Sequence, residues 1–179
     1  MPPRIPRQPA ERGPNRVELD ARLSAELLSA MAGARRRAAR DGDRQIDTAH
    51  LLHSLLESDP QVRQVFDGPV LARLLGYLVQ RSIGYGLLWQ SSVEDSGSVP
   101  VVREAGWSPA AAFAMDCARK RSEKRGDPQA RGLDLLVALA ADTECRAVEV
   151  LGRAGVRAEG LESRVEAAEG GGVAGELPP

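Results

Sequence analysis

Residues 47–56 read "DTAHLLHSLL", and residues 131–140 read "RGLDLLVALA", with leucines at the same three places. The two stretches lie 84 positions apart, and sliding the chain by that distance aligns 23–56 with 107–140 without a gap. Twelve of the 34 aligned positions are identical, whereas chance in a chain this rich in Ala, Arg and Leu would give about three. The chain therefore contains a tandem duplication.

Each copy begins with a pattern typical of a long helix. Ser24 and Ser108 precede this pattern and can accept hydrogen bonds from the free N–H groups of a first turn. Gly42 and Gly126 stand where the pattern ends, and glycine takes the left-handed conformation that closes a helix at little cost. Apolar residues recur at spacings of three and four in between, which predicts one buried face.

Shorter helices follow in each copy. A second helix is predicted near 48–57 and 132–141, with Thr48 as the cap of the first and Gly132 in the matching place. Third and fourth helices are predicted around 60–67 and 70–83, and around 144–154 and 159–168. The expected fold class is all-α, with two pseudo-symmetric four-helix repeats, about eight helices in all, packed into one compact domain. Aromatic residues make up only 3% of the chain, so the core must be aliphatic.

Composition divides the chain into five parts. The ends, 1–17 and 169–179, are expected to be disordered tails, because they are rich in Pro, Arg or Gly and poor in apolar periodicity. Repeat 1 spans 18–83 and repeat 2 spans 107–168, with a Gly-, Ser- and Pro-containing linker at 84–106. The patches "LLW" and "VPVV" indicate that this linker lies against the body. No stretch resembles a signal peptide or a membrane span, so the chain is expected to be cytoplasmic, with no membrane partner.

Several function classes find no support in the residues. The net charge of −1 does not favour nucleic acid as a partner. A GxxxxGK[ST] phosphate loop and a GxSxG nucleophile motif are both missing, so we expect no enzyme and no cofactor. Cys117 and Cys145 lack a CxxC context and are expected to be free thiols that pack as small hydrophobes.

The two histidines of the chain, His50 and His53, pose a question of chemistry. A metal or catalytic role would rest on two residues three apart, without a third ligand at a known spacing. We therefore expect no metal, a first-turn His50 that hydrogen-bonds locally, and a half-exposed His53. The basic run 35–44 can bind phosphates or can be a solvated helix face that Asp41 and Asp43 partly neutralise, and the second interpretation is favoured.

Three stretches together carry a family resemblance: "IDTAHLLHSLLESD" at 46–59, "WSPAAAFAMDCARKRSEKRGD" at 107–127 and "RGLDLLVALAADTECRAVEVLGRAGV" at 131–156. Over about 18–168 the chain resembles the double motif of Clp N-terminal domains, as a stand-alone member without the AAA+ ATPase modules. The resemblance implies non-catalytic docking of substrates, adaptors or peptides, and so a modulating or competing role in Clp-dependent proteolysis. An alternative is a protein that sequesters hydrophobic peptides or peptide antibiotics. The oligomeric state stays open.

The resemblance also implies candidate site residues. In some members the Glu of each "TEH" binds phosphorylated arginine, but the corresponding residues here are Ala49 and Leu133, which leaves phospho-arginine binding open. A second family surface lies where the two long helices begin, and in some members it takes cyclic peptide antibiotics. The matching residues either bind an apolar ligand or only join the two halves; they are Leu28, Met31, Ala32, Trp107 and Ala112.

Overall fold

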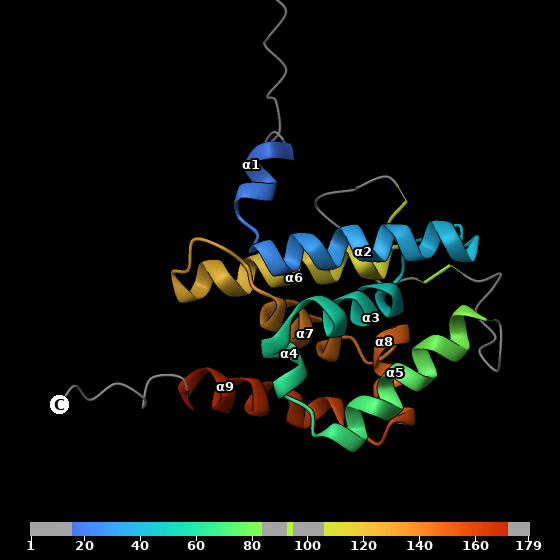
Figure 1. Ribbon diagram of the computed structural model, residues 1–179. Coiled ribbons are helices and arrows are strands. Elements are labelled where there is room, and N and C mark those ends of the chain that lie inside the picture. Colours follow the sequence, from blue (N-terminus) through green and yellow to red (C-terminus); the bar gives the residue numbers. More distant parts are fainter. Residues whose placement is uncertain (1–15, 84–92, 95–105, 172–179) are drawn as a thin grey trace, which may run out of the picture.

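The computed structural model describes residues 16–83, 93–94 and 106–171 of the chain (Figure 1). Within these ranges the chain forms nine α-helices, one short 3-10 helix and no named strand. The all-α prediction is confirmed. None of the described helices is both long enough and apolar enough to cross a membrane.

The first repeat contains the four helices that its sequence predicts, and one more precedes them. The additional helix, α1 (Arg16–Ala21), begins inside the segment that composition predicted to be disordered; the rest of that segment, 1–15, lies outside the described residues. The predicted four are α2 (Ala25–Asp41), α3 (Thr48–Ser58), α4 (Pro60–Gln64) and α5 (Gly68–Ser82).

The second repeat follows the same order. Its helices are α6 (Pro109–Arg125), α7 (Gly132–Ala141), α8 (Arg146–Arg153) and α9 (Leu161–Gly171), with the 3-10 turn η1 (Ala158–Gly160) leading into the last. The two long helices end at the predicted glycines. Gly42 has φ of 70° and Gly126 has φ of 78°, a conformation that residues with a Cβ adopt at a cost.

The caps of the long helices are those that the sequence predicts, whereas the caps of the second helices differ. Ser24 Oγ accepts from Leu27 N–H at 3.2 Å, and Ser108 Oγ accepts from Ala111 N–H at 3.0 Å. The assignment of Thr48 and Gly132 as caps was wrong. Both are the first residues of their helices, and the residues before them, Asp47 and Arg131, take the cap position.

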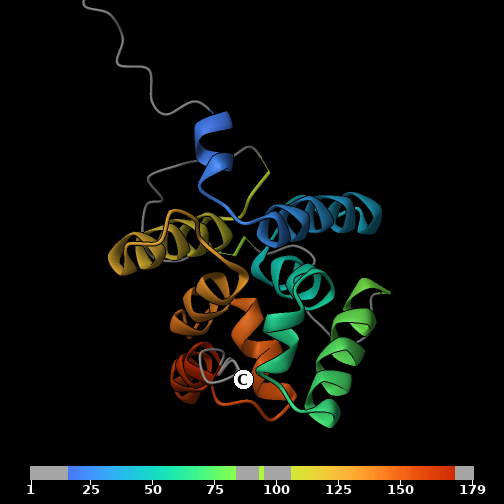
Figure 2. The same cartoon turned by 60° about the vertical axis from the view of Figure 1, so that its left-hand side comes forward.

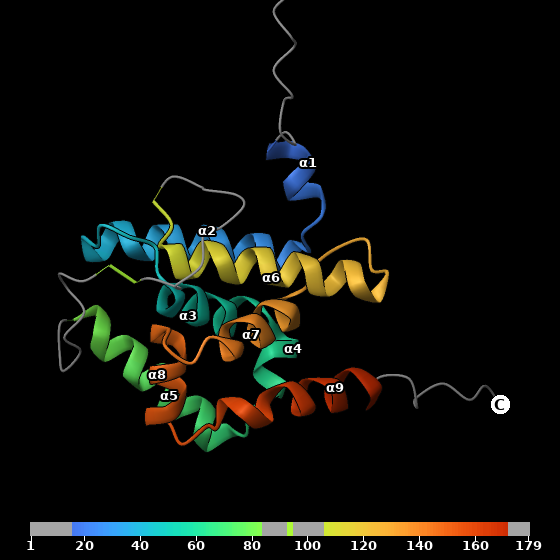
Figure 3. The ribbon, with the colours of Figure 1, turned by 180° about the vertical axis from the view of Figure 1, so that it is seen from behind.

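The helices form layers around two central ones. In Figures 1 and 3, α2 and α6 lie side by side on one side of the molecule, and α3 and α7 lie beneath them. Helices α5 and α9 lie on the opposite side, and Figure 2 shows them flanking α8. Because α3 and α7 are covered from both directions, nearly all their residues are buried. The leucines that the two helices share form the centre of the core, and each of them is 0% exposed: Leu51, Leu52, Leu55, Leu135, Leu136 and Leu139.

A short main-chain crossover joins the start of repeat 1 to repeat 2. Ser24 N–H donates to the Ala130 carbonyl at 2.9 Å, and Ala130 N–H donates to the Arg22 carbonyl at 2.8 Å. This places the beginning of α2 beside the beginning of α7.

A second crossover has the same pattern with the repeats exchanged. Ser108 N–H donates to the Ile46 carbonyl at 2.9 Å, and Ile46 N–H donates to the Gly106 carbonyl at 2.7 Å. A shift of 84 positions carries the first crossover onto the second. The two repeats are thus related by a pseudo-two-fold axis, and the contact between them is isologous, as in a symmetric dimer.

The duplicated core leads to a matched prediction. We expect Leu55→Ala and Leu139→Ala each to lower the free energy of unfolding by about 2–5 kcal/mol, because each removes a fully buried side chain from the same cluster. Val79→Ala, at a side chain that is 51% exposed, should stay within about 0.5 kcal/mol of the parent. Urea denaturation measures all three. A loss confined to one of the two leucines would contradict a core shared by both repeats.

Candidate functional site

The predicted ligand surface is only partly open. Leu28, Ala32 and Trp107 are half-buried, whereas Met31 is 2% exposed and Ala112 is 8% exposed. Met31 belongs to the common core, so its role is packing between the helices. Leu28, Ala32 and Trp107 keep accessible area, and binding at this surface stays a prediction.

The basic run on α2 contributes contacts within the protein. The guanidinium of Arg35 lies over the ring of Trp107, 5.2 Å from its centroid, in a cation–π arrangement. Arg37 forms an ion pair with Glu57 on α3. These two arginines therefore take part in packing α2 against its neighbours.

Neither of the two family phospho-arginine positions reaches the surface. Ala49 is 0% exposed and Leu133 is 3% exposed, and both belong to the core cluster. Each is the second residue of its helix. Their apolar side chains complete the core at the places where the family motif has a carboxylate.

His50 hydrogen-bonds locally, as the sequence predicted. Its Nδ1 accepts from Asp47 N–H at 3.1 Å, and the Asp47 carboxylate accepts from His50 N–H at 2.9 Å. Nε2 of the same ring lies 2.8 Å from Asp43 Oδ2. Asp41, Asp43 and His50 bring ligand-type atoms within 4.8 Å of one another. The reciprocal bonds between Asp47 and His50 cap α3, and the absence of a metal at this cluster stays a prediction.

Asp47 links the first repeat to the second through a buried ion cluster. Its carboxylate is 0% exposed and contacts Arg146 Nη1 of α8 at 2.7 Å and the guanidinium of Arg81 at the end of α5. Burial opposes ionisation, but the contact with His50, the charge of Arg81 and the hydrogen bond from Arg146 hold the pKa of Asp47 far below its ordinary value. Asp47 is therefore ionised and fixes the start of α3.

The second repeat has a comparable cluster with different residues. Asp134, which matches His50, is fully buried and accepts from Arg131 N–H at 2.8 Å and from Arg125 Nη2 at 3.0 Å. Arg121 Nε lies 3.3 Å from the same carboxylate. The cap residue itself has changed from an acid, Asp47, to Arg131. The duplicated fold is thus held by polar groups that have diverged in charge.

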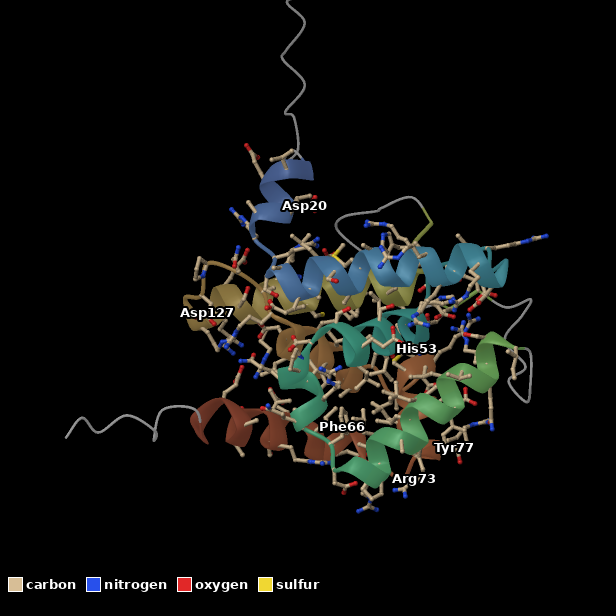
Figure 4. All side chains as sticks on the ribbon, viewed as in Figure 1. Asp20, His53, Phe66, Arg73, Tyr77 and Asp127 are labelled. Atoms are coloured by element: carbon tan, nitrogen blue, oxygen red, sulfur yellow. The ribbon has the colours of Figure 1, made fainter. Side chains whose placement is uncertain are left out.

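A pocket of about 550 Å³ opens at the first crossover, between the starts of α2 and α4 and the loop that leads to α7. Figure 4 shows one of its residues, Asp127, just beyond the end of α6 at the edge of the molecule. The full lining comprises Ser24, Glu26, Asp59, Pro60, Gln61, Asp127, Pro128, Gln129 and Arg131. Both repeats contribute to this pocket.

The pocket is acidic. Glu26, Asp59 and Asp127 supply three carboxylates to the lining; Asp127 lies 3.4 Å from the guanidinium of Arg131 and 2.8 Å from that of Arg125, which is outside the lining. Asp59 is 4% exposed, and burial, with the nearby charge of Glu26, raises the pKa of its carboxyl. A cationic group in the pocket would favour the ionised form of Asp59.

Asp59 also explains why the second repeat has lost its threonine. A methyl group on Gly132, the residue that matches Thr48, would lie 2.1 Å from Asp59 Oδ2, which is far closer than atoms can approach. Asp59 in turn caps α4 by accepting from Gln61 N–H at 2.9 Å. Any residue with a Cβ at 132 therefore requires the Asp59 carboxylate to move.

His53 is more deeply placed than the sequence predicted. Its side chain lies on α3 in the interior (Figure 4) and is 5% exposed, so the expectation of a half-exposed ring was wrong. Burial and the nearby charge of Arg37 lower the pKa of His53 to about 4, although Glu57, at 3.4 Å from Nε2, acts in the opposite direction. The ring is neutral in the folded protein near pH 7.

The arrangement of the helices matches that of solved chaperone domains. The N-terminal domain of the caseinolytic protease associated chaperone ClpD from Arabidopsis thaliana superimposes with a TM-score of 0.62, at 17% identity, over 83% of this chain and 95% of that domain. The chain has the fold of a Clp N-terminal domain. The N-terminal domain of Hsp104 from Candida albicans gives the same TM-score of 0.62 at 12% identity, over 83% of this chain and 91% of that one.

The sequence points to the same group of proteins. The chaperone protein ClpB of Rhodopseudomonas palustris is 30% identical over 143 residues, which are 76% of this chain and 15% of ClpB. The chain thus spans 15% of the length of this curated relative. No protein-family model matches the chain. The predicted resemblance to Clp N-terminal domains is confirmed by the fold and by this relative.

Sequence reasoning missed three of the residues that shape the site. Asp59 stands before Pro60, a pattern typical of a helix cap, and this signal could have identified it. Arg81 and Arg146 carry no local signal, because their partner Asp47 is 34 and 99 positions away.

The linker patches "LLW" and "VPVV" lie outside the described residues, but Glu94 from the same linker is buried against the body, at 5% exposure.

The contact between Gly132 and Asp59 predicts the effect of restoring a side chain. We expect Gly132→Ala to lower the free energy of unfolding by about 2 kcal/mol or more, because Asp59 must leave its place and the cap of α4 with it. Gly76→Ala is the matched control: Gly76 lies inside α5 with no atom within 4 Å of the added methyl, so alanine should stabilise by about 0.5–1 kcal/mol. Denaturant unfolding of both variants measures the difference, and a neutral Gly132→Ala would contradict the assigned position of Asp59.

The buried His53 predicts a pH dependence. Its pKa is about 4 in the folded protein and near 6.5 in the unfolded chain, so between these values the unfolded chain binds the proton. Stability is therefore lost progressively as the pH falls from about 6.5 towards 4. We expect the Tm of His53→Gln to fall less steeply than that of the parent over this range. Thermal unfolding at pH 7.0, 6.0, 5.0 and 4.5 tests this, and parallel curves would show that His53 is not the group responsible.

Proposed function

We propose that this chain is a non-catalytic binding module that docks segments of other polypeptides. The Clp N-terminal fold supports this proposal, because the resemblance associates that fold with docking of substrates and adaptors. The observation that carries it is the acidic pocket at the crossover of the two repeats, where three carboxylates and one guanidinium line a volume of about 550 Å³. A pocket of this size and charge fits one basic side chain.

The bound segment combines a basic residue with an apolar neighbour. Ser24 lines the pocket, and Leu28, one helical turn further along α2, belongs to the predicted apolar surface. One turn advances about 5.4 Å, and an extended peptide covers about 3.3 Å per residue. A basic side chain in the pocket therefore places a residue two positions away within reach of Leu28 and Ala32.

A role in proteolysis follows from this docking. A protein that binds the same segments as the N-terminal domain of a Clp unfoldase lowers the concentration of free substrate available to that unfoldase. We propose that the chain competes in Clp-dependent proteolysis in this way, as a cytoplasmic protein with peptides or proteins as partners. Phospho-arginine is a weak candidate ligand, because Ala49 and Leu133 present no carboxylate.

The test uses a fluorescein-labelled, unstructured peptide with one arginine and a leucine two positions away. We expect the full chain to bind it, and Glu26→Gln and Asp59→Asn each to weaken binding about three- to tenfold, because each removes one negative charge from the pocket. A peptide with citrulline in place of arginine keeps the shape without the charge and should bind as weakly. Fluorescence anisotropy at low and at physiological salt measures these affinities.

Two comparisons keep this result interpretable. Glu166→Gln on α9, an exposed acid outside the pocket, is the control variant and should bind like the parent. Equal binding of the arginine and citrulline peptides would contradict the pocket. The alternative function, sequestration of hydrophobic peptides, rests on the half-exposed Trp107. Two results together would support it: the parent does not bind the arginine peptide, and a neutral cyclic peptide binds the parent but not Trp107→Ala.

A further inference from the structure

The carboxylate of Glu94 lies in the interior although it comes from the segment between the repeats. One oxygen accepts from Arg146 N–H at 2.8 Å and from the Thr48 hydroxyl, and the other accepts from Thr48 N–H at 2.9 Å and from the Ser108 hydroxyl at 3.0 Å. The main-chain carbonyl of the same residue accepts from Ala110 N–H at 3.3 Å. At 5% exposure this is a buried carboxyl group whose two oxygens accept from four donors.

These donors belong to the beginnings of three helices from both repeats. Thr48 is the first residue of α3, Arg146 is the first residue of α8, and Ser108 caps α6. Free N–H groups and the helix dipoles make such ends favourable for negative charge. Here three helix beginnings converge on the carboxylate of Glu94. The Thr48 hydroxyl oxygen accepts from Ala147 N–H at 2.9 Å, which orients the hydroxyl proton towards Glu94.

The surrounding charges favour an anion as well. The guanidinium groups of Arg81 and Arg146 converge on Asp47, which directly precedes Thr48. The site lies at the second crossover, where Ile46 pairs with Trp107. Its pseudo-symmetric counterpart at the first crossover is the place where Asp59 meets Gly132.

The two carboxylates occupy equivalent places but are held differently. Asp59 caps α4 and belongs to the helical framework, so it is fixed by its own helix. Glu94 is 46 residues from Thr48 and 52 from Arg146 in the sequence and is no part of a helix. The caps of α3 and α6 are supplied by Asp47 and Ser108, whereas α8 has no side-chain cap from its own Cys145 and its first N–H is accepted by Glu94.

We propose that these donors form an oxyanion-binding site and that Glu94 is its internal ligand. The site takes a carboxylate or phosphoryl group, and an external anion competes with Glu94 for the N–H groups of Thr48 and Arg146. Because Glu94 is tethered, its effective concentration is high and the parent protein binds free anions weakly. Removal of the Glu94 carboxylate exposes the site to small oxyanions from solution. This inference does not depend on the proposed peptide docking.

The experiment is chemical rescue of Glu94→Ala in the full chain. We expect the variant to have a lower Tm than the parent in chloride, and phosphate or acetate at constant ionic strength to restore a large part of the loss. The apparent Kd for the rescuing anion should be at least about tenfold lower for the variant than for the parent. In ¹H–¹⁵N spectra the anion should shift the amide signals of Thr48 and Arg146. Rescue by acetate alone identifies a planar carboxylate site, and rescue by phosphate alone identifies a tetrahedral oxyanion site.

Controls separate specific rescue from the general stabilisation that phosphate gives to proteins. Glu123→Ala removes an acid whose side chain is 58% exposed and pairs with Arg22, which is not one of these donors, so the variant should respond to anions like the parent. If Glu94→Ala does not fold in chloride, Glu94→Gln keeps the side-chain volume and should show the same excess response to anions. An anion response of the Glu94 variants no greater than that of the parent, or unmoved Thr48 and Arg146 amides, would overturn the proposal.

Discussion

The pair of reciprocal main-chain crossovers is the constraint on which the rest of the structure depends. Four hydrogen bonds of 2.7 to 2.9 Å join Arg22 and Ser24 to Ala130, and Gly106 and Ser108 to Ile46. Each crossover fixes the beginning of one long helix beside the beginning of a central helix from the other repeat. The leucines of α3 and α7 can then share one core, and the ends of several helices from both repeats come together at two places.

These two places share the same main-chain hydrogen-bond pattern but have different side chains around it. At one crossover Thr48 and Ser108 surround the carboxylate of Glu94, and at the other Asp59 fills the space that Gly132 leaves. A helix beginning has unsatisfied N–H groups, and burial makes it costly to leave them without an acceptor. Both sites meet this requirement with a carboxylate of the chain itself. Divergence after duplication therefore changed which residue supplies the acceptor, while an acceptor was kept at each crossover.

The same reasoning connects the fold to binding. The first crossover remains open as an acidic pocket, whereas the second is closed by Glu94. The family phospho-arginine positions are occupied here by Ala49 and Leu133, whose side chains are buried in the core and carry no carboxylate. The acids that line the pocket at the first crossover are Glu26 on α2, the buried Asp59 that caps α4, and Asp127 in the loop before α7. These acids thus lie on a fold that is shared with the N-terminal domains of ClpD and Hsp104.

The sequence by itself determined the duplication, the order of the helices and the ends of the long ones. These features are local: a serine cap, a closing glycine and leucines at helical spacing act within a few residues, so they can be read along the chain. The cap positions at Asp47 and Arg131 were predicted one residue too late. Threonine is itself a good helix cap, and only the contacts of Thr48 with its buried neighbours show that it belongs to the first turn.

The tertiary structure alone decided the polar sites. Glu94 meets Thr48 and Arg146 across 46 and 52 residues, and Arg146 meets Asp47 across 99. The depth of His53 depends on the helices that cover α3 and is not evident from its own helical pattern. Buried charges are stable only when partners from distant segments surround them, and no spacing along the chain records which segments those are.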